Sequence, residues 1–286
     1  MPTKVEKDVV TGTETTGHEW DGIKELNTPL PKWWLYILWA TVLWSAVYYV
    51  LYPSVPWFTG YFKGVLGYSQ RVEHESNLKA ARAAQSKYFT AIKAAAPAAI
   101  LKDNELRSFA LAGGKSAFAD NCAPCHGPGG GGRPGAPVLA DDDWLWGGTV
   151  NQILATIKFG VRSGHDETRA GDMPAFAADD TLKPAQIDAL ADYVLSLSGK
   201  GTATAAAKAL FTENCASCHG EAGKGKTGVG APNLGDAIWL YGNSKKAIAG
   251  QIAKPTHGVM PSWVGRLDEE TLKMLAVYVH SLGGGK

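Results

Sequence analysis

The longest apolar stretch of the chain runs from residue 33 to residue 52. It reads WWLYILWATVLWSAVYYVLY and holds no charged side chain. At about 1.5 Å per residue, a helix of this length spans the roughly 30 Å hydrocarbon core of a bilayer. Aromatic residues stand at both ends of the stretch, as they do at membrane interfaces. The pattern predicts one transmembrane helix.

A cleavable signal peptide is the alternative interpretation of this stretch. Such peptides have a short apolar core close to the start and a cleavage site made of small residues. Here residues 1–32 are mostly polar, and bulky aromatic residues follow the apolar run. We therefore expect an uncleaved anchor.

Residues 53–101 connect the predicted anchor to the rest of the chain. Pro53 ends the helix. The segment Val55–Tyr68 is aromatic but short and contains Lys63, which favours an interfacial position over a second span. Residues 69–96 are rich in Ala, Lys, Arg and Glu, a composition typical of a helix with a solvated face. A helical spacer is the simpler interpretation, and a helix that docks a partner is the alternative.

The remaining chain contains an internal repeat. Apolar positions recur with helical spacing near the end of each copy, and strand-like alternation is absent. Five pairs of segments match in the same order, offset by 93 residues at the first pair and by 85 at the last. They are Phe118-x-x-x-Cys122 and Phe211-x-x-x-Cys215; Gly135-Ala-Pro137 and Gly230-Ala-Pro232; Trp144-Leu-Trp146-Gly and Trp239-Leu-Tyr241-Gly; Met173-Pro and Met260-Pro; and Tyr193-Val-Leu-Ser-Leu197 and Tyr278-Val-His-Ser-Leu282. We predict a mainly α fold with two tandem homologous domains, at residues 102–200 and 201–286.

All four cysteines lie in two copies of one pentapeptide, Cys122-Ala-Pro-Cys125-His126 and Cys215-Ala-Ser-Cys218-His219. The C-x-x-C-H form attaches a c-type haem through both thiols, and the histidine binds the iron. We therefore expect two covalently bound haems c. The cysteines of the two motifs would attach them, and His126 and His219 would be axial ligands.

Other uses of paired cysteines fit this spacing less well. Zinc ribbons place two C-x-x-C pairs about 15 to 20 residues apart, whereas 93 residues separate the pairs here. A thioredoxin-like site or a disulfide framework would leave the repeated histidine unexplained. Haem c is attached outside the cytoplasm, so we expect a cytoplasmic N-terminus and haem domains on the far side of the membrane.

Each haem iron needs a second axial ligand. Met173 and Met260 precede prolines at matching positions of the repeat, whereas the other methionines are the start residue and Met274 within a helical pattern. A thioether ligand raises the reduction potential and closes the iron to small ligands, which suits electron transfer. His165 and His257 are the alternatives, but neither has a counterpart in the other repeat.

Neighbours of the haems can also be predicted. A ligating histidine normally donates its other ring N–H to an acceptor such as a carbonyl. The Gly-Ala-Pro segments that end at Pro137 and Pro232 are placed to offer one. Trp144 and Trp239 would pack on the porphyrin or donate to a propionate, and ordinary core packing is the alternative.

Each repeat resembles a class I cytochrome c, with C-x-x-C-H near its start, a later Met-Pro and an aromatic residue in the last helix. One departure is Ala207, at the helix-crossing position where the first repeat has Gly114. The chain as a whole resembles the FixP/CcoP subunit of cbb(3)-type cytochrome c oxidases. The segments that carry this resemblance are T-T-G-H-x-W-D-G-I-x-E-L-N-T-P-L-P-x-W-W at residues 15–34, the anchor, D-D-D-W-L-W-G-G at residues 141–148 and the terminal A-V-Y-V-H-S-L-G-G-G-K.

This resemblance implies a single-pass dihaem subunit of the bacterial inner membrane, with periplasmic haem domains and no catalytic centre of its own. It would pass electrons from a donor cytochrome c towards the catalytic and monohaem subunits of the oxidase. The resemblance further implies crossed ligation, in which Met260 serves the haem of His126 and Met173 that of His219, although spacing alone would favour the opposite pairing. No nucleic-acid partner is expected. A dihaem peroxidase-like enzyme and a haem-based sensor are the alternative functions.

The charges of the two repeats have opposite signs. Residues 102–200 hold nine basic and thirteen acidic residues, a net −4, while residues 201–286 hold nine basic and six acidic, a net +3. We hypothesise that the acidic first repeat, with Asp141 to Asp143, attracts a basic donor cytochrome. The alternative is that these charges only keep the surface soluble.

Overall fold

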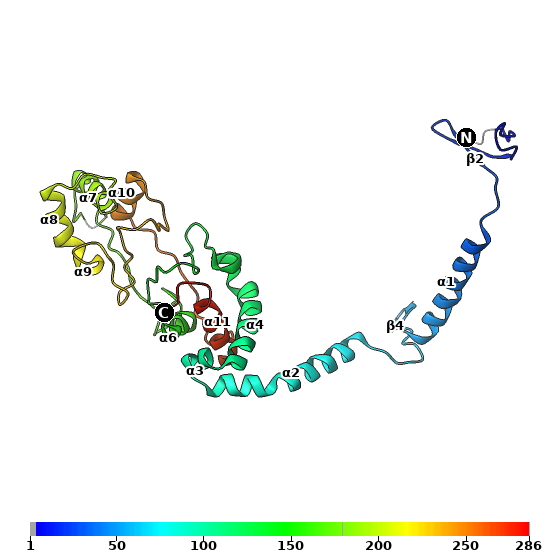
Figure 1. The fold of residues 1–286 in the computed structure, drawn as a ribbon, viewed down its shortest axis with the longest axis horizontal. Coiled ribbons are helices and arrows are strands. Elements are labelled where there is room, and N and C mark those ends of the chain that lie inside the picture. The colour runs from blue at the N-terminus through cyan, green and yellow to red at the C-terminus, as the bar shows by residue number, and fades with distance from the viewer. Residues whose placement is uncertain (1–3, 179, 286) are drawn as a thin grey trace. The chain divides into compact units, whose positions relative to one another are not determined.

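A computed structural model describes residues 4–178 and 180–285 of the chain. The chain forms two compact units, Met1–Ala83 and Ala84–Lys286, and each is described by itself. The fold is mainly helical (Figure 1).

The first unit begins with a β-hairpin that was not predicted. β1 (Thr15–Trp20) pairs antiparallel with β2 (Ile23–Leu26). Asp21 and Gly22 form the turn, with φ values of 49° and 86°. An Asp-Gly pair between two strands is the sequence signal for such a tight turn.

The helix predicted over residues 33–52 is present as α1 (Lys32–Leu51), and it is long and apolar enough to cross a membrane. The chain then folds back on the end of α1 through a short hairpin of β3 (Pro56–Trp57) and β4 (Gly60–Tyr61). Backbone N–H groups of Val65 and Leu66 donate to the carbonyls of Val50 and Leu51, over 2.9 and 3.1 Å. The last carbonyls of the helix therefore find partners within the predicted interfacial segment.

The predicted helical spacer is α2 (Gln70–Ala94), whose last turns belong to the second unit. Its C-terminus is capped by Lys273, a residue only 9 % exposed. The Lys273 ammonium donates to the carbonyls of Ile92, Lys93 and Ala95, over 3.3, 2.7 and 2.8 Å. Three acceptors compensate the burial of this charge and tie the spacer to the second unit.

The second unit continues with short helices joined by long loops. They are α3 (Pro97–Lys102), α4 (Asn104–Asn121), α5 (Ala123–His126), the 3₁₀ turn η1 (Pro128–Gly130), α6 (Val150–Phe159), α7 (Pro184–Ser196), α8 (Ala205–Asn214), α9 (Ala216–His219), α10 (Lys245–Ala253) and α11 (Glu269–His280). Side chains of Asp103, Thr149, Thr204, Ser244 and Asp268 cap α4, α6, α8, α10 and α11, which fixes where these helices begin.

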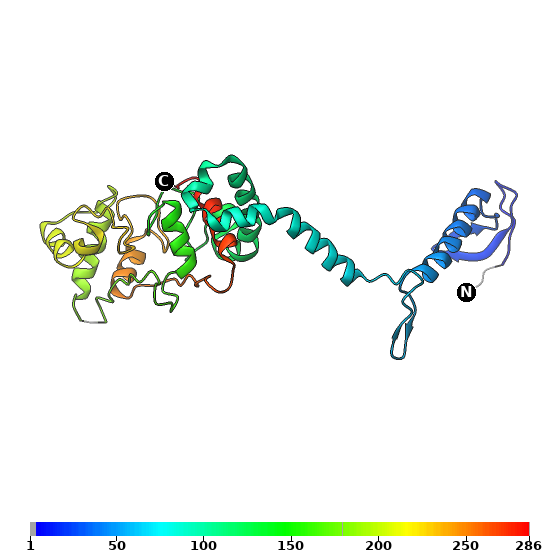
Figure 2. The same cartoon turned by 90° about the horizontal axis from the view of Figure 1, so that it is seen from below.

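Two hydrophobic cores organise these helices, and each combines both repeats. In the first core, Phe118 of α4 and Ile153 of α6 pack with Leu275 of α11. In the second, Leu190 of α7 packs with Phe211 of α8 and with α10. The red α11 lies against the teal α4, and the orange α10 lies beside the yellow-green α7, which also contacts the yellow α8 (Figures 1 and 2). The last helix of each repeat therefore packs on the first helix of the other.

The packing consequently divides the second unit differently from the repeat boundary near residue 200. We call residues 84–162 together with 258–286 the split half, and residues 163–257 the continuous half. Residues 160–173 and 254–263, here called the crossing segments, connect them. Val161 and Met260 exchange two backbone hydrogen bonds across these segments, of 3.0 and 2.9 Å.

Candidate functional site

The two C-x-x-C-H motifs have the same local geometry. Cys122 ends α4 and Cys215 ends α8, with φ/ψ values of −112°/−38° and −119°/−33°. The rest of each motif forms one short helix, α5 or α9, so each histidine stands about one helical turn after the first cysteine and directly after the second. In both motifs the first cysteine is half-buried and the second is exposed.

Both motif histidines are held by a carbonyl, as predicted. Nδ1 of His126 lies 3.0 Å from the Pro137 oxygen, and Nδ1 of His219 lies 3.1 Å from the Pro232 oxygen. A carbonyl only accepts, so this contact is a hydrogen bond when Nδ1 carries the proton. The Nε2 lone pair of each ring is then available to a metal.

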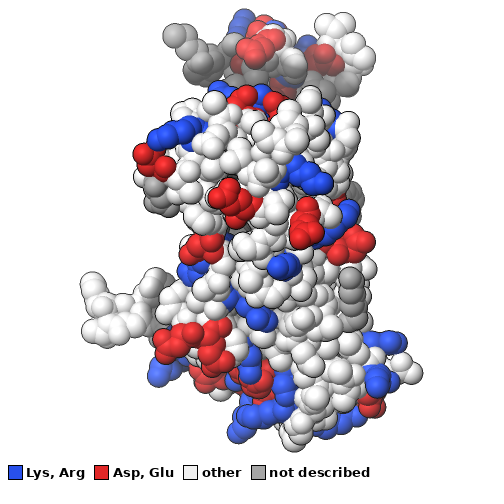
Figure 3. Space-filling model, turned by 90° about the vertical axis from the view of Figure 1, so that its left-hand side faces the viewer, with Lys and Arg blue, Asp and Glu red and all other residues white. Residues whose placement is uncertain are grey.

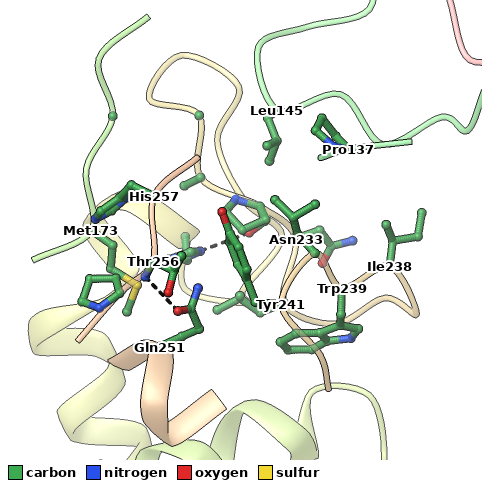
Figure 4. A pocket seen from close by; sticks show the side chains of 18 of the residues that line it. Pro137, Leu145, Met173, Asn233, Ile238, Trp239, Tyr241, Gln251, Thr256 and His257 are labelled. Atoms are coloured by element: carbon green, nitrogen blue, oxygen red, sulfur yellow. Dashed lines mark hydrogen bonds between the residues drawn. The ribbon is translucent and has the colours of Figure 1, made fainter. Parts of the chain in front are cut away.

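A cavity of about 1250 Å³ opens beside the second motif. Its lining includes Cys215, Cys218, His219 and Met173 together with many apolar side chains. Figure 4 shows Met173 beside His257 at one side of this cavity, with Pro137 and Leu145 at another. The volume exceeds the roughly 300–1,000 Å³ of drug-sized ligand pockets. Thiols, a carbonyl-bound histidine and a largely apolar cavity of this size fit a covalently attached porphyrin.

The same cavity shows a contribution that sequence reasoning missed. Residues 131–138, Asp141, Asp143 and Leu145 of the first repeat line the cavity that holds the second motif. The glycine-rich loop after the first motif therefore reaches the neighbouring site. No spacing rule links a loop to a motif of another repeat, so no signal in the sequence pointed to this.

Each methionine lies in the core that contains the motif of the other repeat. Met173 packs on the core of the continuous half, which also includes Phe211 and Cys215. Met260 packs on the core of the split half, with Phe118 and Cys122. The exchange of helices thus groups Met173 with the second motif and Met260 with the first.

Burial sets the protonation preferences of the motif side chains. It raises the pKa of the Cys122 and Cys215 thiols to about 11 in each case, with a smaller contribution from the neighbouring cysteine. Burial also lowers the pKa of His219, against the opposing effect of its bond to Pro232. The neutral imidazole that metal ligation requires is therefore favoured at His219.

The two tryptophans use their indole N–H groups within the protein. Trp144 donates to the Gly284 carbonyl over 2.6 Å, and Trp239 donates to the Asp236 carbonyl over 3.1 Å. Both rings pack on the hydrophobic cores. Both indole N–H groups therefore have acceptors within the protein, and Trp239 also lines the cavity beside the second motif, the position expected for packing on a porphyrin.

The alternative histidine ligands are placed differently from each other. His165 accepts a hydrogen bond at Nδ1 from the Glu167 backbone, over 3.0 Å, and its ring lies against Phe159. His257 lines the cavity near Met173, and its Nδ1 is 3.7 Å from the Asp172 carboxylate. Only His257 of these two lines the cavity of the second motif.

These features define a class of protein. Two C-x-x-C-H motifs, each at the end of a helix, with carbonyl-bound histidines and a methionine in the same helical core, are the elements of a c-type cytochrome. Family models agree: one described as cytochrome c matches residues 111–198. A second, cytochrome c oxidase, cbb3-type, subunit III, matches residues 202–279, and the N-terminal domain of cytochrome oxidase-cbb3, FixP, matches residues 12–59.

Similarity extends over nearly the whole chain. The subunit CcoP of Azospirillum sp. (strain B510) is 52% identical over 98% of both chains. FixP of Bradyrhizobium diazoefficiens is 50% identical over 98% of both, and CcoP of Azospirillum brasilense is 51% identical over 98% of this chain and 99% of its own. The chain belongs to the CcoP/FixP family of cbb3-type cytochrome c oxidase subunits. It is a membrane-anchored electron-transfer subunit with cytochrome c domains, which confirms the expected function.

Proposed function

We propose that the subunit carries two haems c with exchanged methionine ligands. One haem is attached at Cys122 and Cys125 and ligated by His126 and Met260. The other is attached at Cys215 and Cys218 and ligated by His219 and Met173. The observation that carries this pairing is the position of each methionine in the core that holds the opposite motif. Spacing along the chain would favour the reverse pairing, but the crossing segments carry each methionine into the other repeat's site.

A haem with histidine and thioether ligands supplies one-electron transfer at a raised potential. The protein's own residues orient the ligands and shield the sites that such haems would occupy. The carbonyls of Pro137 and Pro232 hold a proton on Nδ1 of His126 and His219, which fixes the ring and keeps Nε2 free for iron. Apolar residues of the two cores exclude water, and Met173 and Met260 would hold the irons through their thioethers and so keep oxygen or peroxide from binding.

Closed iron sites make this chain an electron carrier without a catalytic centre of its own. A dihaem peroxidase requires an open or displaceable position at one iron, and two methionines in matching sites oppose that function. A haem-based sensor would need an output domain. Oxygen reduction therefore belongs to other subunits of the oxidase.

Attachment of haem c outside the cytoplasm sets the orientation that we propose. The hairpin before α1 would lie in the cytoplasm of a bacterium, and the second unit would lie in the periplasm. There it would take electrons from a donor cytochrome c and pass them to the monohaem and catalytic subunits.

The charge difference between the repeats is largely cancelled by the exchange of helices. Counted over residues 102–286, the split half has nine basic and nine acidic residues, a net 0, and the continuous half has nine and ten, a net −1. On the face drawn in Figure 3, basic and acidic side chains are interspersed in small groups. The remaining basis for attracting a basic donor is local: Asp141 and Asp143 lie close enough to Asp236 for the three carboxylates to repel one another.

The pairing of ligands can be tested one haem at a time. In a Cys215→Ser/Cys218→Ser chain, only the first haem is attached. Met260→His should then abolish the thioether-to-iron charge-transfer band of the oxidised protein, while Met173→His should leave it. The converse is expected in a Cys122→Ser/Cys125→Ser chain. The reverse outcome in both chains would establish ligation within each repeat and refute the exchange.

A further inference from the structure

Arg162 lies where the first crossing segment leaves the split half. Its backbone has φ 53°, a left-handed conformation that is uncommon for a residue with a side chain. Such strain persists only where the surrounding structure determines it, and it concentrates at functional sites. The Arg162 side chain is 24% exposed and reaches the edge of the cavity beside the second motif.

The guanidinium of Arg162 contacts both crossing segments. Nε donates to the Gly258 carbonyl over 2.8 Å, and Nη1 donates to the Gly171 carbonyl over 2.8 Å. Gly171 stands two residues before Met173, and Gly258 stands two residues before Met260. One side chain therefore binds the backbone at the same position of both methionine loops.

The backbone around Arg162 adds to this connection. Val161, its neighbour, forms two hydrogen bonds with Met260 itself. The Asp172 carboxylate lies 3.8 Å from Nη1, and Asp172 stands between Gly171 and Met173 in the sequence. A planar guanidinium offers several donors at fixed angles, so it can hold two carbonyls at a set separation. A lysine ammonium has no such geometry.

We infer that Arg162 is a positioning residue that fixes how far both axial methionines extend toward their haem sites. This inference rests on the proposed exchanged ligation. In this arrangement neither methionine loop can move without disturbing the hydrogen bonds that Arg162 makes to the other. Because thioether ligation sets the potential of each haem, Arg162 also makes the two potentials depend on one side chain.

The test compares Arg162→Gln and Arg162→Lys with Arg169→Gln in the full-length, dihaem subunit. Arg169 is a matched control, since it lies in the same crossing segment and its side chain packs against Trp146. Haem content is measured first. Two readouts follow: the thioether-to-iron band of the oxidised protein and a redox titration that resolves both haems.

Arg162→Gln is expected to weaken the thioether band and to lower both potentials, while Arg169→Gln leaves both unchanged. Arg162→Lys is expected to cause smaller shifts in the same direction. If the glutamine variant does not incorporate both haems, the lysine variant alone provides the test. Three results would overturn the inference. They are unchanged spectra, full rescue by lysine, and a shift at one haem only, which is expected if Arg162 simply pairs with one propionate. Absence of the thioether band from the unmodified subunit would instead refute methionine ligation itself.

Discussion

Gly114 of α4 lies directly against Tyr278 of α11. A Cβ placed on Gly114 would fall 2.7 Å from the Tyr278 Cβ and still closer to the carbonyl oxygen of Met274. The first helix of one repeat and the last helix of the other therefore meet with almost no space between their backbones. Ala207 has the corresponding position in α8 and is accommodated there at 1% exposure.

Gly114→Ala is expected to lower the free energy of unfolding by about 1–3 kcal/mol, the usual cost of overpacking a filled core. Denaturant unfolding of the detergent-solubilised subunit measures it. Gly250→Ala in α10 is the matched control, because nothing lies within 4 Å of a Cβ at that position. The control should gain about 0.5–1 kcal/mol from the better helix former. Equal effects of the two variants would contradict close packing of α4 on α11.

Lys273→Met should free the end of the spacer helix. The change removes a buried ammonium that donates to the carbonyls of Ile92 and Lys93 in α2 and of Ala95 just after it, and carbonyls left without a partner cost about 1–3 kcal/mol. Hydrogen exchange should quicken in the last turns of α2. Lys246→Met, at an exposed lysine of α10, should change stability by no more than about 0.5 kcal/mol. Unaltered exchange at α2 would show that the cap is dispensable.

Asp143→Asn should stabilise the subunit at neutral pH. Burial, followed by repulsion from Asp236, raises the pKa of Asp143 above 3.8. The native state therefore binds this proton more tightly than the unfolded chain does, and stability falls as pH rises from 3.8 through the raised value. The advantage of the asparagine variant should accordingly be full at neutral pH and vanish below that window. Unfolding curves of the two proteins across pH give the difference, and an asparagine variant that is no more stable than the unmodified subunit at neutral pH would contradict the prediction.

Neutralising two of the three consecutive acidic residues Asp141 to Asp143 should slow reduction by a basic donor cytochrome. Asp142→Asn/Asp143→Asn is compared with Asp166→Asn/Glu167→Gln, which removes the same charge from exposed residues of the first crossing segment. At low salt the first pair should reduce the rate more, and the difference should shrink above 0.1 M salt, where the screening length is about 10 Å. Stopped-flow reduction kinetics provide the measurement. Equal slowing by both pairs would assign the effect to net charge alone.

The sequence predicted individual elements well and their partners poorly. The anchor, the spacer and the carbonyls of Pro137 and Pro232 follow from hydrophobicity, composition and spacing, which act locally. The exchange of helices does not. Tyr193-Val-Leu-Ser-Leu197 and Tyr278-Val-His-Ser-Leu282 present nearly the same pattern, so either helix could pack on α4 or α8. The crossing segments decide between them, and Arg162 lies in a loop where no motif marks it.

The nesting of the continuous half within the split half has a consequence for biogenesis. Synthesis and export deliver the chain from its N-terminus, so α4 and the first C-x-x-C-H motif emerge long before α11, which lies near the end of the chain. The helices of the continuous half have all emerged by Ala253. The first motif to emerge is therefore the last to be enclosed by its core, and under the proposed function its thiols would stay accessible for haem attachment until α11 had been made.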